Sequence, residues 1–387
     1  MSRVNVNPEL LKWAIDRLGD HDIVEAKFPN LSKWLNGELK PTLKQLEDFA
    51  KTTHTPIGYL FMSDPPEEKF PIPHYRTLGN VQDFRPSPNL IETIRTMERR
   101  QEWMRDYLID IGRGPLEFVG SAANQSNPKK IAQNMRDIMG LKTNWASKKG
   151  SWQDALNDLL QAIQDIGILV MVNGIVGNNT HRKLSVDEFR GFILVDDYAP
   201  LIFINGADGK AAQMFTISHE LAHVWLGASA AFDLNMLQPS NDETEILCNK
   251  IAAEFLVPEI DFMNLWEEVK YNDDKYQQIA RYFKVSELVV VKRALDLNFI
   301  SFSKYKAFYK EREEYDIQRR IDSSDGGGNF YNTANWRIGP MFADAIISRV
   351  TEGKMLYREA YQLTGIRGIT FDTFVKKRTS NRRGYNG

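Results

Sequence analysis

The stretch Phe215-Thr216-Ile217-Ser218-His219-Glu220-Leu221-Ala222-His223-Val224-Trp225 decides how the rest of the chain is interpreted. Its centre reads H-E-x-x-H, and two histidines at this spacing share one face of a helix and can converge on one zinc ion. Glu220 lies about 100° further round the helix, where its carboxylate can hold a water beside the metal. The pattern therefore predicts His219 and His223 as metal ligands and Glu220 as a catalytic residue.

The residues around this motif predict where the helix begins and ends. Asp208 can cap its start, and Gly227 can end it in a left-handed turn. On a helical wheel, a set of apolar residues lies opposite the two histidines: Met214, Ile217, Leu221, Val224 and Trp225. One side of the helix is expected to pack into a core while the other faces a cleft.

Length and composition exclude several classes of protein. A chain of 387 residues with 42% hydrophobic and 26% charged residues is ordinary for a globular protein of two or three domains. The net charge of −2 gives no overall attraction to nucleic acid or to an anionic membrane. The apolar runs are too short to span a bilayer, and residues 1–5 lack the apolar core of a signal peptide. A single cysteine, Cys248, fits a reducing compartment, so we expect a cytoplasmic protein without a membrane partner.

Residues 1–66 are expected to form a domain of short helices. Residues 31–46 resemble the second half of a phage-repressor-type (XRE) helix-turn-helix, but too little chain precedes them for two full helices and a turn. Eight Lys and Arg against nine Asp and Glu over residues 1–65 give no excess of positive charge for phosphate contacts. We expect a degenerate module that binds protein or DNA, with DNA at most a weak partner.

The rest of the chain predicts three more regions. Residues 67–270 begin with a proline-rich linker and should contain amphipathic helices, then strands at 167–172, 191–195 and 201–204, and then the motif helix. Residues 271–322 have helix-turn-helix periodicity, and residues 331–379 form a small helical unit followed by a basic, solvated tail. This order predicts an α+β fold, predominantly helical, with a small antiparallel sheet beside the motif helix and helical modules on either side.

A catalytic zinc usually has three protein ligands and a water, so a third ligand is needed. Glu243, Glu245 and Glu254 lie on the next predicted helix. Glu245 shares a face with small or apolar residues, whereas Glu243 and Glu254 lie on the opposite, presumed solvent side. A carboxylate on an apolar face needs a cation, which favours Glu245 as the ligand. The alternative is that Glu245 is an exposed glutamate in the first turn of the helix. Cys248, one turn further along, is expected to be a packed residue.

These two blocks resemble the ImmA/IrrE family of metallo-endopeptidases. The second block reads Glu245-Ile246-Leu247-Cys248-Asn249-Lys250-Ile251-Ala252-Ala253-Glu254-Phe255-Leu256-Val257-Pro258, where the family has E-x-x-A-N-x-F-A-A-x-L-L-M-P. In the family the leading glutamate is the third zinc ligand, and it aligns with Glu245. Cys248 and Ile251 depart from the pattern without affecting a ligand. The resemblance covers residues 1 to about 270 and includes members with a helix-turn-helix module.

The resemblance implies a zincin-like fold and a Zn²⁺-dependent, site-specific endopeptidase. Its protein substrates would be helix-turn-helix transcriptional repressors of stress or mobile-element genes. His219, His223 and Glu245 would hold the zinc, and Glu220 would act as the general base. The strands at 191–195 and 201–204 should form a hairpin, which could bind substrate by strand addition, with His181 or Tyr198 as candidates to stabilise the oxyanion. The alternative function is a non-proteolytic regulator or antitoxin-like binding module with a vestigial metal site.

Overall fold

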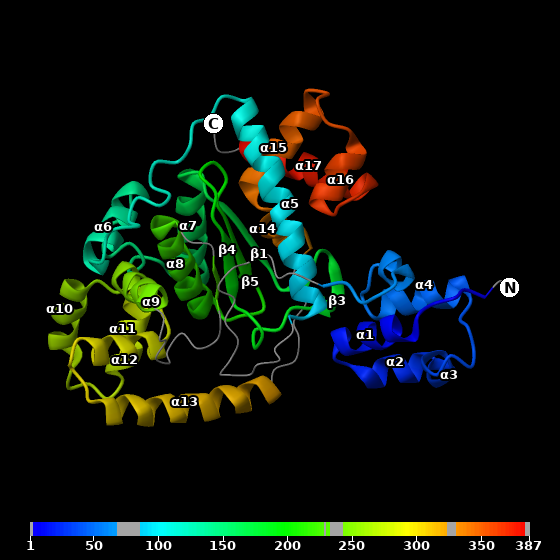
Figure 1. Cartoon of the computed structure of the whole chain (residues 1–387). Coiled ribbons are helices and arrows are strands. Elements are labelled where there is room, and N and C mark those ends of the chain that lie inside the picture. The colour runs from blue at the N-terminus through cyan, green and yellow to red at the C-terminus, as the bar shows by residue number, and fades with distance from the viewer. Residues whose placement is uncertain (1–2, 68–85, 228–229, 233–242, 323–329, 384–387) are drawn as a thin grey trace. The chain divides into compact units, whose positions relative to one another are not determined.

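The computed structural model describes residues 3–67, 86–227, 230–232, 243–322 and 330–383 (Figure 1). It is predominantly helical, with 60% helix and a small mixed sheet, which confirms the predicted α+β class. The described residues divide into two compact units, one ending at Arg95 and the other beginning at Thr96 within the same long helix, α5 (Pro88–Asp110). Among the described helices, none combines the length and the apolar character that a membrane crossing requires.

The first unit is built from short helices around an aromatic core. Phe28, Trp34 and Phe49 are buried, and their rings lie 5.6–6.4 Å apart. Thr42 and Gln45 form a capping box at the start of α4, with each side chain bonded to the backbone of the other. The elements are α1 (Pro8–Leu18), α2 (His21–Lys27), α3 (Leu31–Leu35), α4 (Leu43–Thr52) and the 3₁₀ helix η1 (Ile57–Phe61).

The second unit contains a four-stranded sheet in the order β1-β5-β4-β6. β4 (Gly191–Leu194) pairs antiparallel with both β5 (Leu201–Asn205) and β6 (Ala230–Phe232). β1 (Leu169–Asn173) runs parallel to β5, with Leu169 opposite Leu201. The sheet is therefore mixed, whereas a purely antiparallel sheet was predicted. The parallel pair arises because β1 lies next to β5 and runs in the same direction. A separate antiparallel pair joins β2 (Ile175–Val176) to β3 (Asn179–Lys183).

Helices cover the sheet and surround the motif helix, α8 (Lys210–Leu226). α8 packs against β4 and β5, and α7 (Trp152–Asp165) packs against α8 and β1. Gly191 makes the close approach to α8 feasible, because a Cβ there would lie 2.7 Å from Thr216 Cγ2 and 2.9 Å from the Phe203 carbonyl oxygen. α6 (Pro128–Ile138) and α9 (Glu243–Leu256) pack together on the other side of α8.

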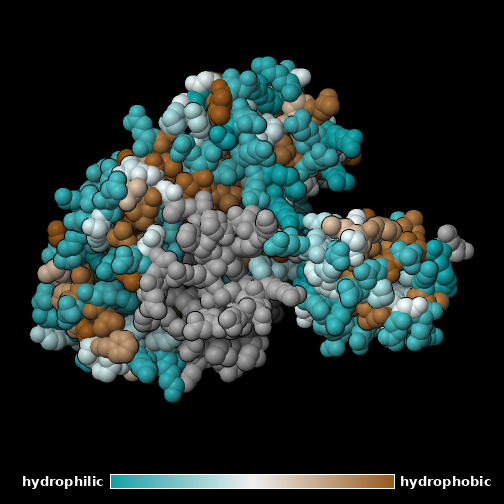
Figure 2. Space-filling view, viewed as in Figure 1, coloured by the Kyte–Doolittle hydropathy of each residue, from teal (hydrophilic) through white to brown (hydrophobic). Residues whose placement is uncertain are grey.

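The helices after α9 continue the same unit. The main core cluster includes residues from Ala122 to Ala294, on both sides of residue 270, where a domain boundary was predicted. α10 (Glu259–Val269), α11 (Lys275–Phe283) and α12 (Glu287–Asp296) pack in sequence, and α13 (Phe302–Asp322) packs against α12. The face shown in Figure 2 is mostly hydrophilic, with hydrophobic residues interspersed over these helices.

The last four helices lie beside α5 and β1 (Figure 1). They are α14 (Phe330–Ile338), α15 (Pro340–Thr351), α16 (Tyr357–Thr364) and α17 (Gly368–Arg383). Arg100 of α5 is buried and donates to the carbonyl oxygens of Leu363 (2.9 Å) and Arg337 (2.8 Å). Burial lowers the pKa of Arg100 to about 10, so it stays a cation at neutral pH. The basic segment from Lys376 to Arg383, where a solvated tail was predicted, is instead the second half of α17.

Candidate metal centre

α8 ends as predicted but begins differently. Gly227 adopts φ 73°, and its N–H reaches back to the carbonyl oxygens of His223 and Val224, a left-handed C-cap. The prediction that Asp208 caps the start is wrong, because the N-cap is Gly209 and makes no side-chain cap bond. The Asp208 carboxylate instead accepts a hydrogen bond from Arg190 at 2.6 Å, an ion pair that ties the segment before α8 to the start of β4.

The motif helix is buried on all sides, whereas the sequence predicted one open face. Every residue from Gln213 to Trp225 is buried. The apolar side contacts the sheet and α7 as expected, and α9 covers the histidine side. His219 and Glu220 are 0% exposed and His223 is 1% exposed, so the polar motif lies inside the protein. Buried polar groups of this kind require partners or a bound cation.

The structure brings the three predicted ligands together. His219 Nε2 and His223 Nε2 lie 3.0 Å apart. The two carboxylate oxygens of Glu245 lie 3.2 Å from His219 Nε2 and 3.3 Å from His223 Nε2. Glu245 stands in the first turn of α9 and is partly buried, so it is neither the fully exposed glutamate of the alternative interpretation nor a core residue. Among the described residues, these three form the one group of His, Cys, Asp and Glu side chains able to hold a metal.

The spacing of these atoms fits a zinc ion. Zinc bound to His nitrogen and carboxylate oxygen at about 2.0–2.1 Å in tetrahedral geometry keeps its ligand atoms about 3.3 Å apart. The observed separations of 3.0, 3.2 and 3.3 Å are close to that value. Two neutral imidazoles and one carboxylate are also the donor set of a catalytic zinc site with one open position.

Asn249 orients the first histidine. Its Oδ1 lies 3.0 Å from His219 Nδ1, and since an amide oxygen only accepts, Nδ1 carries the proton. Burial, with His223 nearby, lowers the pKa of His219, so the ring is neutral at pH 7 and its Nε2 presents a lone pair. That lone pair points at the Glu245 carboxylate, an electron-rich contact that a cation between them would relieve. This contact was not predicted from the sequence, although Asn249 lies one helical turn after Glu245 on α9.

The electrostatics of the two glutamates are opposite. Burial would raise the pKa of Glu245, but the adjacent His219 and His223 rings outweigh it and hold that pKa well below its usual range. Burial, followed by repulsion from Glu245, raises the pKa of Glu220 well above its usual value. Both Glu220 carboxylate oxygens are buried and have no hydrogen-bond partner among the described residues. An unpartnered carboxyl group in the interior is costly, which is typical of a group kept for function.

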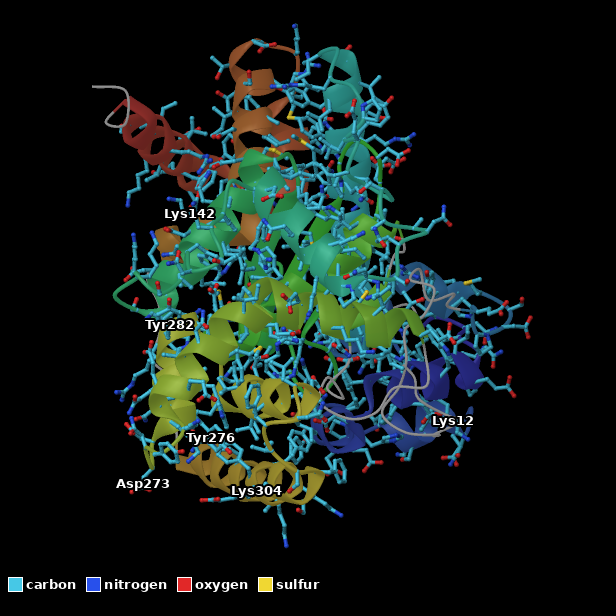
Figure 3. The ribbon with its side chains drawn as sticks, turned by 90° about the vertical axis from the view of Figure 1, so that its left-hand side faces the viewer. Lys12, Lys142, Asp273, Tyr276, Tyr282 and Lys304 are labelled. Carbon is cyan, nitrogen blue, oxygen red and sulfur yellow. The ribbon has the colours of Figure 1, made fainter. Side chains whose placement is uncertain are left out.

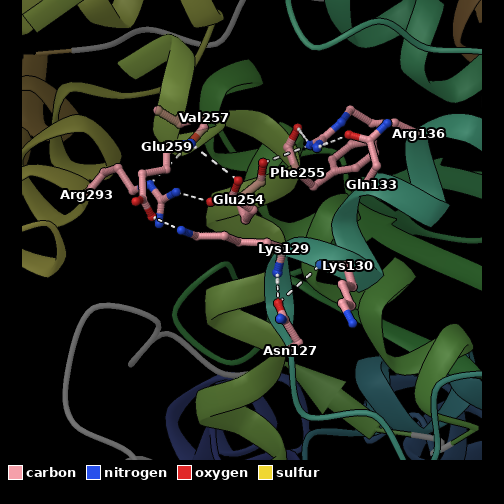
Figure 4. A network of polar contacts seen from close by, with 10 residues as sticks. All are labelled: Asn127, Lys129, Lys130, Gln133, Arg136, Glu254, Phe255, Val257, Glu259 and Arg293. Carbon is pink, nitrogen blue, oxygen red and sulfur yellow. Dashed lines mark hydrogen bonds and ion pairs between the residues drawn. The ribbon is translucent and has the colours of Figure 1, made fainter. Parts of the chain in front are cut away.

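Glu254 was predicted to lie on the solvent side, but it is buried and has a structural role. It is 6% exposed and forms an ion pair with Arg293 of α12, which is 7% exposed (Figure 4). Its Oε1 accepts from the Glu259 N–H at 3.3 Å, and Arg293 also donates to the Val257 carbonyl oxygen at 3.1 Å. On the other side, Arg136 of α6 donates to the Glu254 carbonyl oxygen at 2.8 Å. This network fixes the end of α9 between α6 and α12.

The remaining predicted residues lie elsewhere. His181 is exposed on β3, and Tyr198 lies in the β4–β5 turn, where it lines a cavity of about 700 Å³ with residues of α5, α7 and α15. Cys248 is fully buried in the core cluster, as expected for a packed cysteine. The predicted hairpin is confirmed, but the outer edge of β4 is already paired with β6 over residues 191–193. A substrate strand could therefore not add to β4 there without displacing β6.

The sequence and structure were compared with known proteins and family models. No curated protein matches the sequence. A solved structure, a Mycobacterium tuberculosis transcriptional regulator, is similar at 18% identity with a TM-score of 0.27, over 50% of this chain and 51% of that one. This chain thus spans about half the length of that protein, and so low a TM-score carries no conclusion about fold or function. Residues 338–377 match a domain of unknown function (DUF8813).

Residues 163–295 match the family model of the IrrE N-terminal-like domain, Peptidase_M78. This segment contains β1, β4, β5, α8 and α9, and therefore the whole His219–His223–Glu245 cluster together with Glu220. The match supports a peptidase-type domain of the ImmA/IrrE family over these residues.

Proposed function

We propose that the protein is a zinc-dependent endopeptidase. The observation that carries this proposal is the convergence of His219, His223 and Glu245 at zinc-like separations, beside a buried and unpartnered Glu220. In the proposal the first three residues hold the ion, and Asn249 keeps the His219 ring in the tautomer that leaves Nε2 available.

Each residue has a defined part in peptide hydrolysis. When bound, zinc supplies Lewis-acid chemistry, which polarises a scissile carbonyl and acidifies a nearby water. Glu220 accepts the proton of the attacking water and passes it to the leaving amine. Its unpartnered carboxylate oxygens suit this part, because no hydrogen bond from the described residues competes for them.

A vestigial site in a binding module is the alternative, and the condition of Glu220 argues against it. An unpartnered carboxyl group buried next to the Glu245 carboxylate destabilises the fold. A site without catalytic function would have no reason to keep this destabilising group. The sequence resemblance implies transcriptional repressors as substrates, so we propose that cleavage of a helix-turn-helix repressor in the cytoplasm relieves repression.

The test compares the wild-type protein with Glu220→Gln, which keeps all three ligands. Each form is produced in cells together with a candidate repressor encoded beside it, and new protein N-termini are identified by mass spectrometry. Wild type should generate a repressor fragment, and Glu220→Gln should reduce its rate of formation by about 10²–10⁴-fold, the usual contribution of a general base. Relief of repression by both forms without any fragment would show a binding module instead.

A further inference from the structure

The last two helices form a compact helix-turn-helix. α16 ends at Thr364 and α17 begins at Gly368, so three residues connect them. Gly365 makes the turn at φ 74°, a conformation that glycine adopts without strain. The ring of Tyr361 meets the ring of Phe371 at 5.3 Å, and Phe371 and Phe374 of α17 are both buried. A three-residue turn with glycine between two packed helices is a feature of helix-turn-helix DNA-binding motifs.

The second helix of this pair leaves its outward side open. Ile369 is 85% exposed, and Lys376 and Ser380 follow it on the same side of α17, opposite the buried Phe371 and Phe374. Lys377 and Arg367 are exposed beside this row. Figure 3 shows α17 (red) at the edge of the molecule. Thr373 lies between Ile369 and Lys376 in this row. We call the set of Ile369, Thr373, Lys376, Lys377 and Ser380 the α17 face.

Charge is concentrated in the same region. Residues 338–383 contain nine Lys and Arg against four Asp and Glu, a net charge of +5 in a chain whose total is −2. The ion pair between Asp344 and Arg378 lies within this region and leaves its net charge unchanged. A basic helix face on an otherwise acidic protein attracts a polyanion.

The other helix pairs with three-residue turns lack these features. α12, the second helix of the α11–α12 pair, has Asp296 as its one exposed residue, so it cannot enter a groove. α3, the second helix of the α2–α3 pair, is five residues long, and the surrounding residues 1–65 carry no positive excess. Among the described helix pairs, α16–α17 alone combines an exposed second helix with a basic charge.

We propose that the α17 face binds duplex DNA, with α17 in the major groove. The hydroxyl groups of Thr373 and Ser380 and the two lysines are groups that contact phosphates and base edges, and Ile369 suits a thymine methyl. α16 would cross the backbone, as the first helix of such motifs does.

The α16–α17 pair is attached to the domain that carries the metal centre, so DNA binding would also position that domain. Arg100 bonds to the end of α16, and Arg349 of α15 pairs with Asp110 of α5. The α16–α17 pair is thereby fixed to the sheet domain that carries the metal centre. If the proposed function holds, DNA binding would deliver the peptidase to proteins that are themselves bound to DNA; the binding itself does not depend on proteolysis.

The experiment measures binding of the full-length protein to a fluorescein-labelled random-sequence duplex by anisotropy, over a range of salt concentrations. The test variant is Lys376→Gln with Lys377→Gln, and the matched control is Lys304→Gln with Lys306→Gln, two exposed lysines of α13, which lies at the opposite end of the molecule from α17 (red) in Figure 3. Each phosphate contact contributes about 0.9 to the slope of log affinity against log salt. The test variant should lower the slope by about 2 and weaken binding, and the control should leave the slope unchanged. Ile369→Asp, at an exposed position, should also weaken binding without affecting folding.

Several results would overturn the proposal. One is wild-type binding no tighter than about 10⁻⁴ M at physiological salt, the weak limit of non-specific DNA binding. Another is an equal loss of slope in the test and control variants, which would mean general electrostatics rather than the α17 face. Tighter binding to single-stranded RNA or to vesicles containing phosphatidylserine, lost in the same test variant, would assign the face to a different partner. Zinc content and proteolysis are measured in parallel, so failure of this proposal is distinguishable from failure of the proposed function.

Discussion

For Glu254→Ala, the loss of stability expected from the structure is much larger than the loss expected from the helical wheel. On the helical wheel Glu254 lies with Glu243 on a presumed solvent side, where truncation would shift stability by no more than about 0.5 kcal/mol. In the structure its carboxylate pairs with Arg293, and both residues are less than 8% exposed. Removing the carboxylate leaves the Arg293 guanidinium buried without a counter-charge and the Glu259 N–H without its acceptor.

The expected cost follows from that burial. Breaking a buried ion pair by removing one partner typically destabilises a protein by about 3–5 kcal/mol. Arg293 keeps its hydrogen bond to the Val257 carbonyl, which places our expectation at the lower end of that range. The effect should be local to the α6–α9–α12 packing. Glu245 lies nine residues earlier on α9, about 13 Å along the helix, so zinc binding should survive.

Hydrogen exchange read by mass spectrometry suits a chain with two compact units, because it reports opening free energies for separate segments. A loss of about 3 kcal/mol corresponds to exchange about 10²-fold faster in peptides of α9 and α12. Glu243→Ala, exposed on the same helix, is the control and should change exchange about two-fold at most. The double variant Glu254→Met with Arg293→Met replaces the pair by apolar groups and should lose less than either single variant. Glu254→Ala exchange equal to that of Glu243→Ala would refute the reasoning.

Two further predictions concern the site and its support. Asn249→Ala removes the hydrogen bond to His219 Nδ1 and should weaken zinc affinity by about 10–100-fold in a chelator competition, while Glu243→Ala should leave it unchanged; equal affinities would show that Asn249 does not orient the ligand. Gly191→Ala places a methyl group 2.7 Å from Thr216 Cγ2 and should destabilise the α8–sheet contact by about 1–3 kcal/mol, measured by hydrogen exchange of α8. Gly114→Ala has no atom within 4 Å of the added Cβ and serves as its control; similar effects of the two would contradict the close approach at Gly191.

The parts of the site that depend on local spacing could be predicted from the sequence. The spacing of four positions from His219 to His223 places them one helical turn apart whatever the fold, and a helical wheel was enough to separate Glu245 from Glu243. Gly227 ends α8 for an equally local reason. These relations hold within single helices, so one sequence contains them.

The parts that depend on distant partners could not be predicted in this way. Glu254 seemed exposed because its partner Arg293 lies 39 residues later, on a different helix. The parallel pairing of β1 with β5 depends on where β4 and β6 pair, and β6 has three residues, too few for a period to show. Asp208 is a good capping residue by type, but Arg190, 18 residues earlier, holds its carboxylate. In each case a tertiary contact outweighed the local preference.

Zinc content tests the central claim most directly. Wild type, Glu220→Gln and Glu245→Ala are purified after growth with zinc, and metal per chain is measured by plasma mass spectrometry. We predict one zinc per chain in wild type and in Glu220→Gln, because Glu220 is a base and not a ligand, and almost none in Glu245→Ala, because two histidines alone do not complete the site. Full zinc in Glu245→Ala, or loss of zinc in Glu220→Gln, would contradict the assignment of the metal centre.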